Sequence, residues 1–204
     1  MSVESNPQTD LLAKSQLSLL DAIEKLSLAL LLPSEANAQL VTLEKSRKFD
    51  QDHWVASVLL DTSRASVNFR VHFSTTNGRH LLASSFQADP TSLTPEQVLD
   101  FLKEYCNLVM GYTKGALAGD LGKEDLQTVF LPKLAPSYDK YKILPTGLVK
   151  VLEERWWSIT WPDNGELFLY AQVKSDTGFN DETFKSLASA HQISIDNGGE
   201  VEFL

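Results

Sequence analysis

Residues 94–118 read TPEQVLDFLKEYCNLVMGYTKGALA, and this stretch holds the start, the two faces and the end of one long helix. Thr94 is suited to the N-cap, because its hydroxyl can accept from a free backbone N–H of the first turn. Pro95 stands at the first helical position, where its missing N–H is no loss, and Gln97 can return a capping-box bond. The stretch therefore predicts a helix that runs to about Ala118.

This helix has an apolar face and a polar face when its residues are placed at about 100° intervals. A glycine in mid-helix costs about 1 kcal/mol of stability relative to alanine. A partner backbone that comes close to the helix would explain why a glycine stands at position 111. A charged row opposite an apolar face is also what any surface helix shows. The apolar face holds Val98, Phe101, Leu102, Tyr105, Leu108, Val109 and Tyr112, and the polar row holds Asp100, Glu104, Asn107, Gly111 and Lys114.

Before this helix the pattern changes to strands. Residues 54–60 and 67–73 flank a turn-rich tetrad and predict an antiparallel hairpin. In the second run the apolar residues alternate with Asn68, Arg70 and His72. One face of the hairpin is therefore expected to be buried and the other wet.

The N-terminal part of the chain is less regular. Leucines and an isoleucine at helical spacing predict a first helix over residues 9–32, preceded by a flexible start at 1–8. Residues 75–87 fit either period and are interpreted as a short helix. Residues 33–52 are mixed and favour no element.

After the long helix the sequence again indicates strands. The dipeptide Asn164–Gly165 predicts a tight hairpin, because both central residues of a type I′ turn need positive φ. Helices interspersed with antiparallel strand pairs indicate an α/β domain of two layers over residues 9–204. The elements expected here are strands near 127–131, 149–161 and 166–174, a short helix over 180–190 and a terminal hairpin over 193–203.

Composition excludes several classes of protein. The 204 residues include 18 Lys and Arg against 27 Asp and Glu, a net charge of −9 that argues against nucleic acid or an anionic membrane as a partner. The single Cys106 rules out a disulfide framework within the chain. The longest aliphatic run, 26–32, is well short of the roughly 20 apolar residues of a membrane span. Residues 1–10 contain no Lys or Arg, unlike a signal peptide, and a cytoplasmic protein is expected.

The polar row of the long helix resembles a known motif. The pattern Asp100-x3-Glu104-x2-Asn107, followed by Pro132 at the end of a predicted strand, is similar to the signature of the CheC, CheX and FliY chemotaxis phosphatases. The run EYCNLVMG at 104–111 also resembles the helix of that family, in which an acid, an asparagine and a following glycine recur. One copy of the motif is present, as in CheX.

The resemblance implies a fold, an activity and a partner. The fold would be a two-layer CheC/CheX-like α/β domain, with a mainly antiparallel sheet and long helices on one face. The activity would be hydrolysis of the phospho-aspartate on a CheY-like response-regulator receiver domain, which brings its own Mg²⁺ and a lysine, so no cofactor of this chain is expected. Asn107 would position the attacking water and Glu104 would dock the lysine. The residues expected to contact the partner are Asp100, Gly111 and Lys114.

These residue types suit that chemistry. Positioning and charge stabilisation supply most of the catalysis in phosphoryl transfer. A neutral carboxamide can both accept from and donate to a water without repelling the phosphoryl group. The same row also fits a second hypothesis, a non-catalytic CheX-like module that docks a receiver or a flagellar-motor component. Exposure of Glu104 and Asn107 favours the phosphatase, whereas burial or capping salt bridges favour the module.

Other features have two readings. The aromatic runs at 156–161 and 167–170 indicate either core packing or a subunit interface, and CheX-like proteins are dimers through their sheets, so a homodimer is expected. The four histidines have no metal-ligand spacing, and no metal site is expected. Cys106 has the acid Glu104 nearby rather than a cation, which indicates an inert thiol.

Overall fold

The capping box at the start of the long helix forms as predicted. The Thr94 backbone N–H donates to Gln97 Oε1 over 2.8 Å, and the Gln97 N–H donates to Thr94 Oγ1 over 3.3 Å. Pro95 is the first residue of this helix, α4 (Pro95–Leu121). These features are seen in a computed structural model that describes residues 19–31, 37–44, 49, 53–61, 65–121, 128–136, 151–162 and 165–175.

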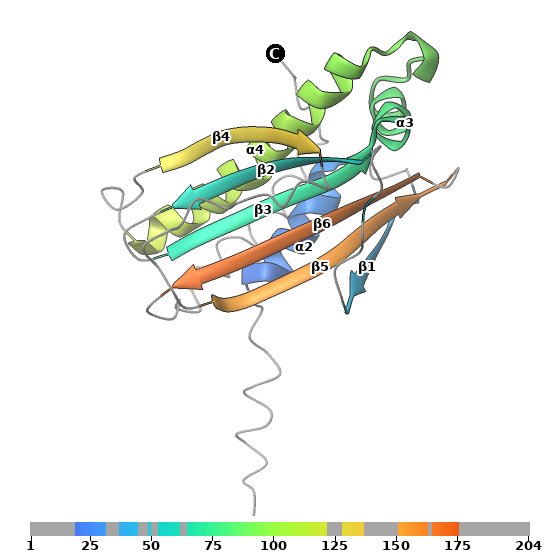
Figure 1. Cartoon of the computed structure of the whole chain (residues 1–204). Coiled ribbons are helices and arrows are strands. Elements are labelled where there is room, and N and C mark those ends of the chain that lie inside the picture. Colours follow the sequence, from blue (N-terminus) through green and yellow to red (C-terminus); the bar gives the residue numbers. More distant parts are fainter. Residues whose placement is uncertain are drawn as a thin grey trace, which may run out of the picture.

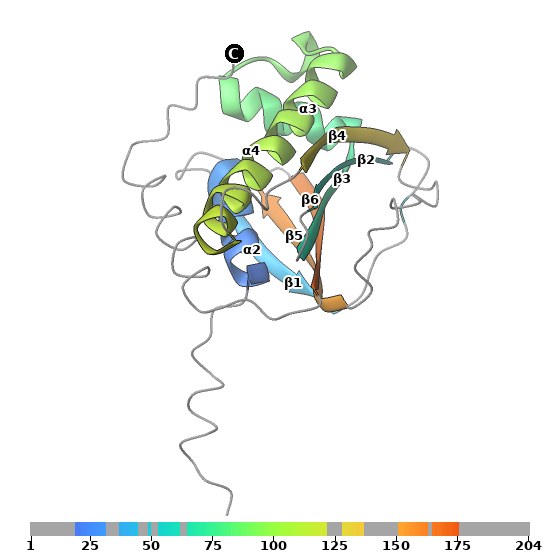
Figure 2. The ribbon, with the colours of Figure 1, turned by 90° about the vertical axis from the view of Figure 1, so that its left-hand side faces the viewer.

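The described residues form a six-stranded antiparallel sheet covered by helices. The strand order is β1-β5-β6-β3-β2-β4, and α2 and α4 lie on the same face of the sheet (Figures 1 and 2). This is the predicted two-layer α/β fold. The helices are α2 (Leu19–Leu31), α3 (Thr75–Phe86), the short 3₁₀ helix η1 (Pro90–Ser92) and α4; the strands are β1 (Gln39–Leu43), β2 (His53–Asp61), β3 (Ala65–Ser74), β4 (Thr128–Pro136), β5 (Val151–Trp161) and β6 (Gly165–Ser175).

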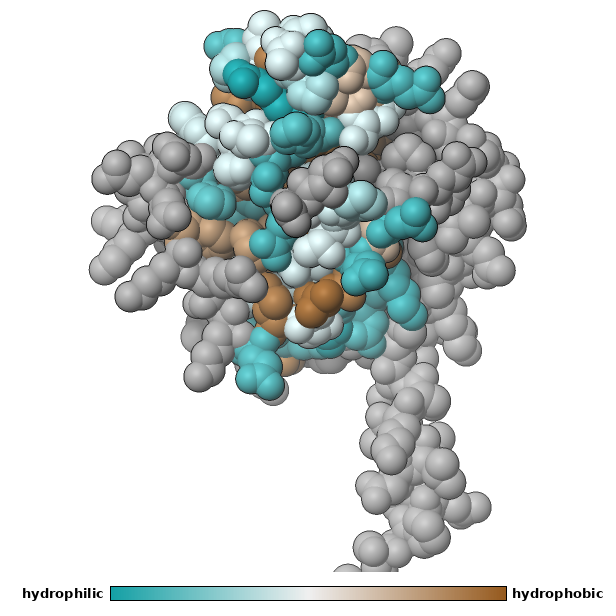
Figure 3. Space-filling view, turned by 90° about the vertical axis from the view of Figure 1, so that its right-hand side faces the viewer, coloured by the Kyte–Doolittle hydropathy of each residue, from teal (hydrophilic) through white to brown (hydrophobic). Residues whose placement is uncertain are grey.

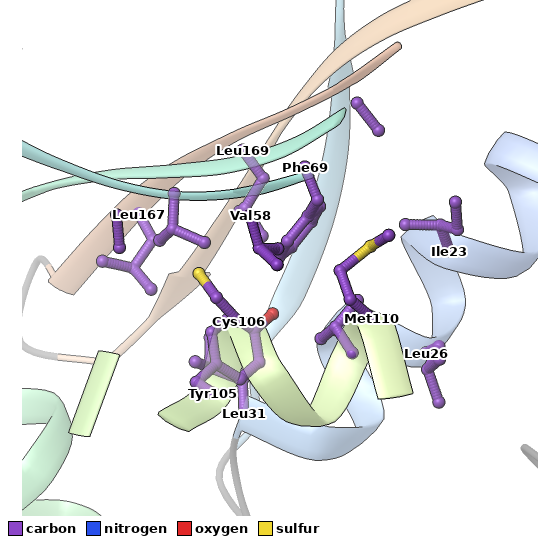
Figure 4. Close-up of a cluster of buried hydrophobic side chains, with 14 of the residues drawn as sticks. Ile23, Leu26, Leu31, Val58, Phe69, Tyr105, Cys106, Met110, Leu167 and Leu169 are labelled. Carbon is purple, nitrogen blue, oxygen red and sulfur yellow. The ribbon is translucent and has the colours of Figure 1, made fainter. Parts of the chain in front are cut away.

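The core lies between the sheet and helices α2 and α4. Figure 4 shows side chains from both helices and from β2, β3 and β6 meeting there. The buried face of α4 includes Cys106 and Met110, which the spacing had left out, and Met110 points toward Ile23 of α2. In return Leu108 is only half-buried and Tyr112 is exposed. The packing of α2 beside α4 thus turns the buried face of α4 away from Leu108 and Tyr112.

A hydrogen-bond network at Ser27 joins α2 to α4 and β5. The Tyr105 hydroxyl donates to the Ser27 carbonyl oxygen over 2.7 Å, and Trp157 Nε1 donates to Ser27 Oγ over 3.1 Å. The Ser27 hydroxyl in turn donates to the Glu24 carbonyl oxygen over 2.6 Å. All these polar groups are buried, so each bond also removes the cost of an unsatisfied partner.

Arg155 of β5 links α2 to the sheet through carboxylates. Its guanidinium pairs with Asp21, with Glu24 at 2.8 Å and with Glu153 at 2.9 Å. Thr42 donates to the other oxygen of Glu24 over 2.8 Å. Burial by itself would lower the pKa of Arg155, but the hydrogen bonds with Asp21 and Glu24 outweigh it and raise that pKa. Glu24 lies off the apolar stripe in the sequence, yet this pairing buries it.

Several predicted elements are confirmed and others are not. The hairpin β2–β3, the short helix α3 and strands β5 and β6 are confirmed. β1 falls in the segment where no element was expected. The proposal that Pro132 ends its strand is wrong, because β4 continues through it to Pro136. Among the described strands β4 pairs only with β2, and an edge strand tolerates proline because one side of its backbone needs no donor.

Some expectations fall outside the described residues. The first helix is confirmed for its part within α2, whereas residues 9–18 of the prediction and the flexible start at 1–8 are outside. So are the short helix at 180–190 and the terminal hairpin at 193–203. The single domain over 9–204 therefore stays a prediction. No helix in the described part of the chain is both long and apolar enough to span a membrane.

The outer face of the β2–β3 hairpin is not wet, contrary to expectation. Asn68 and His72 are buried, with 6% and 5% of their surfaces exposed. The Phe49 ring stacks on the His72 ring at 4.2 Å between centroids and 4° between planes, and Trp156 lies 5.3 Å from His72. Burial, followed by the nearby charges of Arg70 and His53, lowers the pKa of His72 to about 3.

The β5–β6 hairpin needs a glycine for a reason other than the predicted one. Gly165 is not a central turn residue, because it is the first residue of β6 and pairs with Trp161. A Cβ atom added to Gly165 would lie 1.9 Å from the Trp161 ring. The indole of Trp161 occupies the space that a side chain at this position would need.

Gly165→Ala is therefore expected to lower the free energy of unfolding by at least about 1 kcal/mol, the usual cost of an overpacked site. Urea denaturation of both proteins measures this difference. In the Trp161→Leu background, Gly165→Ala should lower the free energy of unfolding by less than it does in the wild type, because the indole is no longer there. Equal stability of Gly165→Ala and the wild type would contradict the steric argument.

Candidate functional site

The polar row of α4 lies on the side of the helix that faces away from the sheet. Asp100, Glu104 and Gly111 are exposed, and Asn107 and Lys114 are half-buried. The opposite side of α4 packs on β2 and α2, which fixes the direction of the row. The helix thus brings together all five residues that the sequence proposed, although it leaves Asn107 and Lys114 less open than the other three.

Glu104 and Asn107 form a pair on the helix surface. Asn107 Nδ2 donates to Glu104 Oε2 over 3.3 Å, a contact between side chains three residues apart. Within the described residues Glu104 makes no salt bridge, so its carboxylate can still take a cation from outside. The carbonyl oxygen of the Asn107 amide is the acceptor that could hold a water. An exposed Glu104 without a capping ion pair fits the catalytic hypothesis, and Asn107 beside it is half-buried rather than buried.

Asp100 has a different environment from Glu104. Lys103 Nζ lies 2.5 Å from Asp100 Oδ1, and both side chains are exposed. An exposed pair of this kind contributes little to stability. It does offset the charge of Asp100, so Glu104 is the stronger attractor for a cation on this face. Lys103 was not among the predicted site residues, although its i,i+3 spacing from Asp100 is visible in the sequence.

The glycine of the row leaves open space at the surface. Among the residues that the structure describes, a Cβ atom added to Gly111 would meet no atom within 4 Å, and the same holds for Gly115. Gly78 of α3 shows the opposite case, since its Cβ would lie 2.4 Å from Val98 Cγ1. Internal packing thus explains Gly78 and does not explain Gly111. Either a partner molecule approaches the helix at Gly111, or the helix simply tolerates a glycine there.

The remaining candidate groups contribute nothing to the row. Cys106 is fully buried, and burial raises the pKa of its thiol, which keeps it in the unreactive protonated form. Of the histidines, His80 is exposed, His53 is half-buried and His72 is buried, while His191 is outside the described residues. The rings of His53 and His72 both lie beside the Phe49 ring, at 5.5 and 4.2 Å between centroids. No group of three metal-ligating side chains occurs in the part of the chain that the structure describes.

Comparison with known proteins gives a fold but no sequence relative. No protein-family model matches the chain, and no curated protein matches its sequence. A chain of the CheX–CheY–BeF₃–Mg²⁺ complex from Borrelia burgdorferi superposes with a TM-score of 0.52 and 17% identity, covering 77% of this chain and 96% of its own. CheX from Vibrio vulnificus gives 0.52 and 14%, covering 75% and 99%. A CheC-like protein from Shewanella oneidensis gives 0.50 and 13%, covering 76% and 92%.

These similarities define a class of fold. They extend over about three quarters of this chain and over almost the whole of each solved structure. The chain has the fold of the CheC and CheX chemotaxis proteins, as the motif on α4 predicted. At identities below one fifth, the likeness concerns the fold and leaves the roles of individual residues to be argued from the site.

Proposed function

We propose that this chain is a CheX-like phosphatase that hydrolyses the phospho-aspartate of a CheY-like response-regulator receiver domain. The water oxygen would form a bond to phosphorus as the bond from phosphorus to the aspartate oxygen breaks, which releases inorganic phosphate and a free carboxylate. Asn107 would hold the water in line with that bond. Glu104 would bind the lysine of the receiver by a charge-assisted hydrogen bond.

The observation that supports this proposal is the surface pair of an exposed Glu104 and a half-buried Asn107 on a rigid helix. Both side chains project from α4, whose other face is fixed by the core, so their separation is held without a loop. Phosphoryl transfer depends mainly on positioning and on stabilising charge, and two well-placed polar side chains suffice for such a contribution. The sole carboxamide of the row is therefore the residue to test.

The partner and its metal belong to the same proposal. One solved structure with this fold is a complex of CheX with CheY, BeF₃ and Mg²⁺, which supports a receiver domain as the partner. Mg²⁺ would be carried by the receiver, and this chain would need no cofactor of its own. Asp100, Gly111 and Lys114 would contact the receiver around the Glu104–Asn107 pair. A cytoplasmic location, where response regulators act, is part of the same proposal.

The direct experiment is phosphate release from a panel of phosphorylated receiver domains with and without this protein. Acceleration of release from at least one receiver supports the phosphatase. Binding to a receiver with no acceleration would replace it by the non-catalytic docking module, the second hypothesis for this row. Neither binding nor acceleration across the panel would exclude both.

Gly111→Ala tests whether a partner comes close to the helix. The variant should raise the free energy of unfolding by about 1 kcal/mol, because alanine favours a helix and its Cβ meets no atom. It should also weaken receiver binding, since the methyl group fills the space proposed for the partner. Gly115→Ala is the matched control, with the same open space one turn further from Glu104. Greater stability with unchanged binding would remove Gly111 from the proposed interface.

The homodimer remains a prediction. Most of the aromatic side chains that suggested it are buried within the chain, including Trp157 in the core and Phe168 and Tyr170 on the outer face. Trp156 is half-buried and is the one that could still contribute to an interface. Sedimentation velocity at micromolar concentration should report a dimer that Trp156→Glu converts to monomer. A wild-type monomer would contradict the prediction.

A further inference from the structure

Two exposed aromatic residues lie along one flank of the polar row. Phe86, the last residue of α3, has 53% of its surface exposed, and Tyr112 of α4 has 39%. Leu108, which is half-buried, lies along α4 between Tyr112 and the Phe101 position that Phe86 contacts. Single exposed apolar residues need no explanation, but several of them along one side of a proposed site indicate a surface for a partner.

Helix geometry places Leu108 and Tyr112 on one stripe of α4, beside the row that holds Glu104. Phe101, Leu108 and Tyr112 are seven and four residues apart, which puts them on one stripe of α4. The Phe86 ring packs edge-on against the Phe101 ring, 6.3 Å between centroids, and Phe101 is buried. Leu108 follows Glu104 by four residues and so lies one helical turn from the acid of the row, whereas Phe86 lies at the Phe101 end of the stripe, about 16 Å along the helix axis from Tyr112. We call Phe86, Leu108 and Tyr112 the apolar flank.

The position of Phe86 is well determined by the end of α3. The helix closes on Gln87, which adopts the left-handed conformation with φ of 51°, and its backbone N–H donates to the Ala83 carbonyl oxygen. The Ala88 N–H donates to the same oxygen over 3.0 Å. A residue other than glycine is strained in this conformation, so the end of α3 is held there by its own hydrogen bonds. Phe86 is thus presented to solvent by an ordered helix end.

The surroundings of the apolar flank are polar. On the side of the molecule drawn in Figure 3, the coloured surface is mostly hydrophilic or neutral and its hydrophobic areas are small and separate. Asp100 and Glu104 lie on the row beside the flank, and Glu96 at the start of α4 and Asp89 before it are two further exposed acids. A partner that fits this surface needs a cation for the row and an apolar side chain for the flank.

We propose that the apolar flank is the second half of the receiver-docking surface, and that it takes an apolar side chain of the receiver next to the lysine that Glu104 binds. The inference rests on the proposed function and adds to it a determinant of affinity separate from catalysis. Charge argues against a second copy of this chain as the occupant, because a second copy would bring a net charge of −9 and the same acidic row to an acidic surface, whereas the receiver brings the lysine proposed for Glu104. Continuity with the Glu104–Asn107 pair places both contacts under one partner.

The experiment measures binding and turnover separately. A CheY-type receiver domain saturated with beryllofluoride and Mg²⁺ is titrated with the wild type, Phe86→Ser, Phe86→Leu and Tyr112→Ser, and phosphate release is measured with the phosphorylated form. Phe86→Ser should raise Kd about tenfold, the ordinary effect of removing a half-exposed aromatic ring from an interface. It should raise KM with kcat unchanged, because the flank does not touch the reacting atoms. Phe86→Leu should retain most of the affinity.

Val41→Ser is the matched control, because Val41 is 47% exposed on the edge strand β1, away from α4. It should leave Kd unchanged, and thermal denaturation should show each variant folded. If the wild type binds the receiver and Phe86→Ser and Tyr112→Ser bind it equally well, the inference is overturned and the proposed function stands. If Phe86→Ser instead changes the sedimentation of the protein and not receiver binding, the flank is a contact between copies and the inference also fails. If the wild type binds no receiver, the proposed function fails with it.

Discussion

Asn107→Ala is expected to slow catalysed dephosphorylation of the receiver by about 100- to 1000-fold, with receiver binding largely intact. Removal of one group that positions or stabilises the reacting atoms costs about 3 to 4 kcal/mol in such sites. The amide acts mainly in the transition state, so kcat should fall and Kd for the beryllofluoride complex should not. Asn107→Asp, which has almost the same shape, should be as slow, because a second acid beside Glu104 would repel the phosphoryl group. Single-turnover phosphate release measures these rates.

Glu104→Gln provides the companion measurement. It keeps an acceptor for the Asn107 amide and removes the charge, so it should weaken receiver binding more than it lowers the rate of the bound complex. Both variants should fold, because the pair lies on the surface and a contact of this type contributes only a few tenths of a kcal/mol. Full activity of Asn107→Ala would refute the assigned role of the amide, even if the protein binds receivers.

The stability of the fold should decrease between pH 7 and pH 5 because of His72. Its pKa is lowered to about 3 in the folded protein, from an ordinary value of about 6.5 that the unfolded chain regains. Between these values the unfolded state binds a proton that the folded state does not, so the free energy of unfolding falls as pH falls through 6.5. From pH 7 to pH 5 the loss amounts to about 2 kcal/mol. Urea denaturation at a series of pH values measures it.

His72→Phe should reduce the slope of the free energy of unfolding against pH by the equivalent of about one bound proton. The phenyl ring does not titrate, and it can still stack on Phe49. His80→Gln is the control, since His80 is exposed on α3, and it should leave the dependence of the wild type unchanged. Equal slopes for His72→Phe and the wild type between pH 5 and 7 would mean that His72 is not held neutral.

Local spacing predicted the elements that depend on local interactions. The capping box and the helix α4 depend on residues a few positions apart, and the pairing of β2 with β3 joins neighbouring segments, and each of these was found as expected. The row from Asp100 to Lys114 was predicted for the same reason, because exposure of one helix face follows from burial of the other. The fold class followed from the order of these elements together with the motif.

Features that depend on distant partners could not be predicted in this way. Glu24 is buried because Arg155, 131 residues away, pairs with it. The outer face of β3 is covered because Phe49 stacks on His72, and no alternation pattern contains that partner. Pro132 sits inside β4 because that strand is at the sheet edge, which is known only once the strand order is known. The contact of Phe86 with Phe101 likewise depends on how α3 crosses α4.

The hydrogen bond from Tyr105 to the Ser27 carbonyl also sets the rotation of α4 about its own axis. A helix held only by leucine and valine contacts could turn by a fraction of a residue with little loss, whereas a bond of 2.7 Å between buried groups has one preferred angle. Tyr105 follows Glu104 directly and precedes Asn107 by two residues, so any such turn would swing both side chains through the same arc. The direction in which Glu104 and Asn107 project is therefore set from within the core, by the buried Ser27 of another helix.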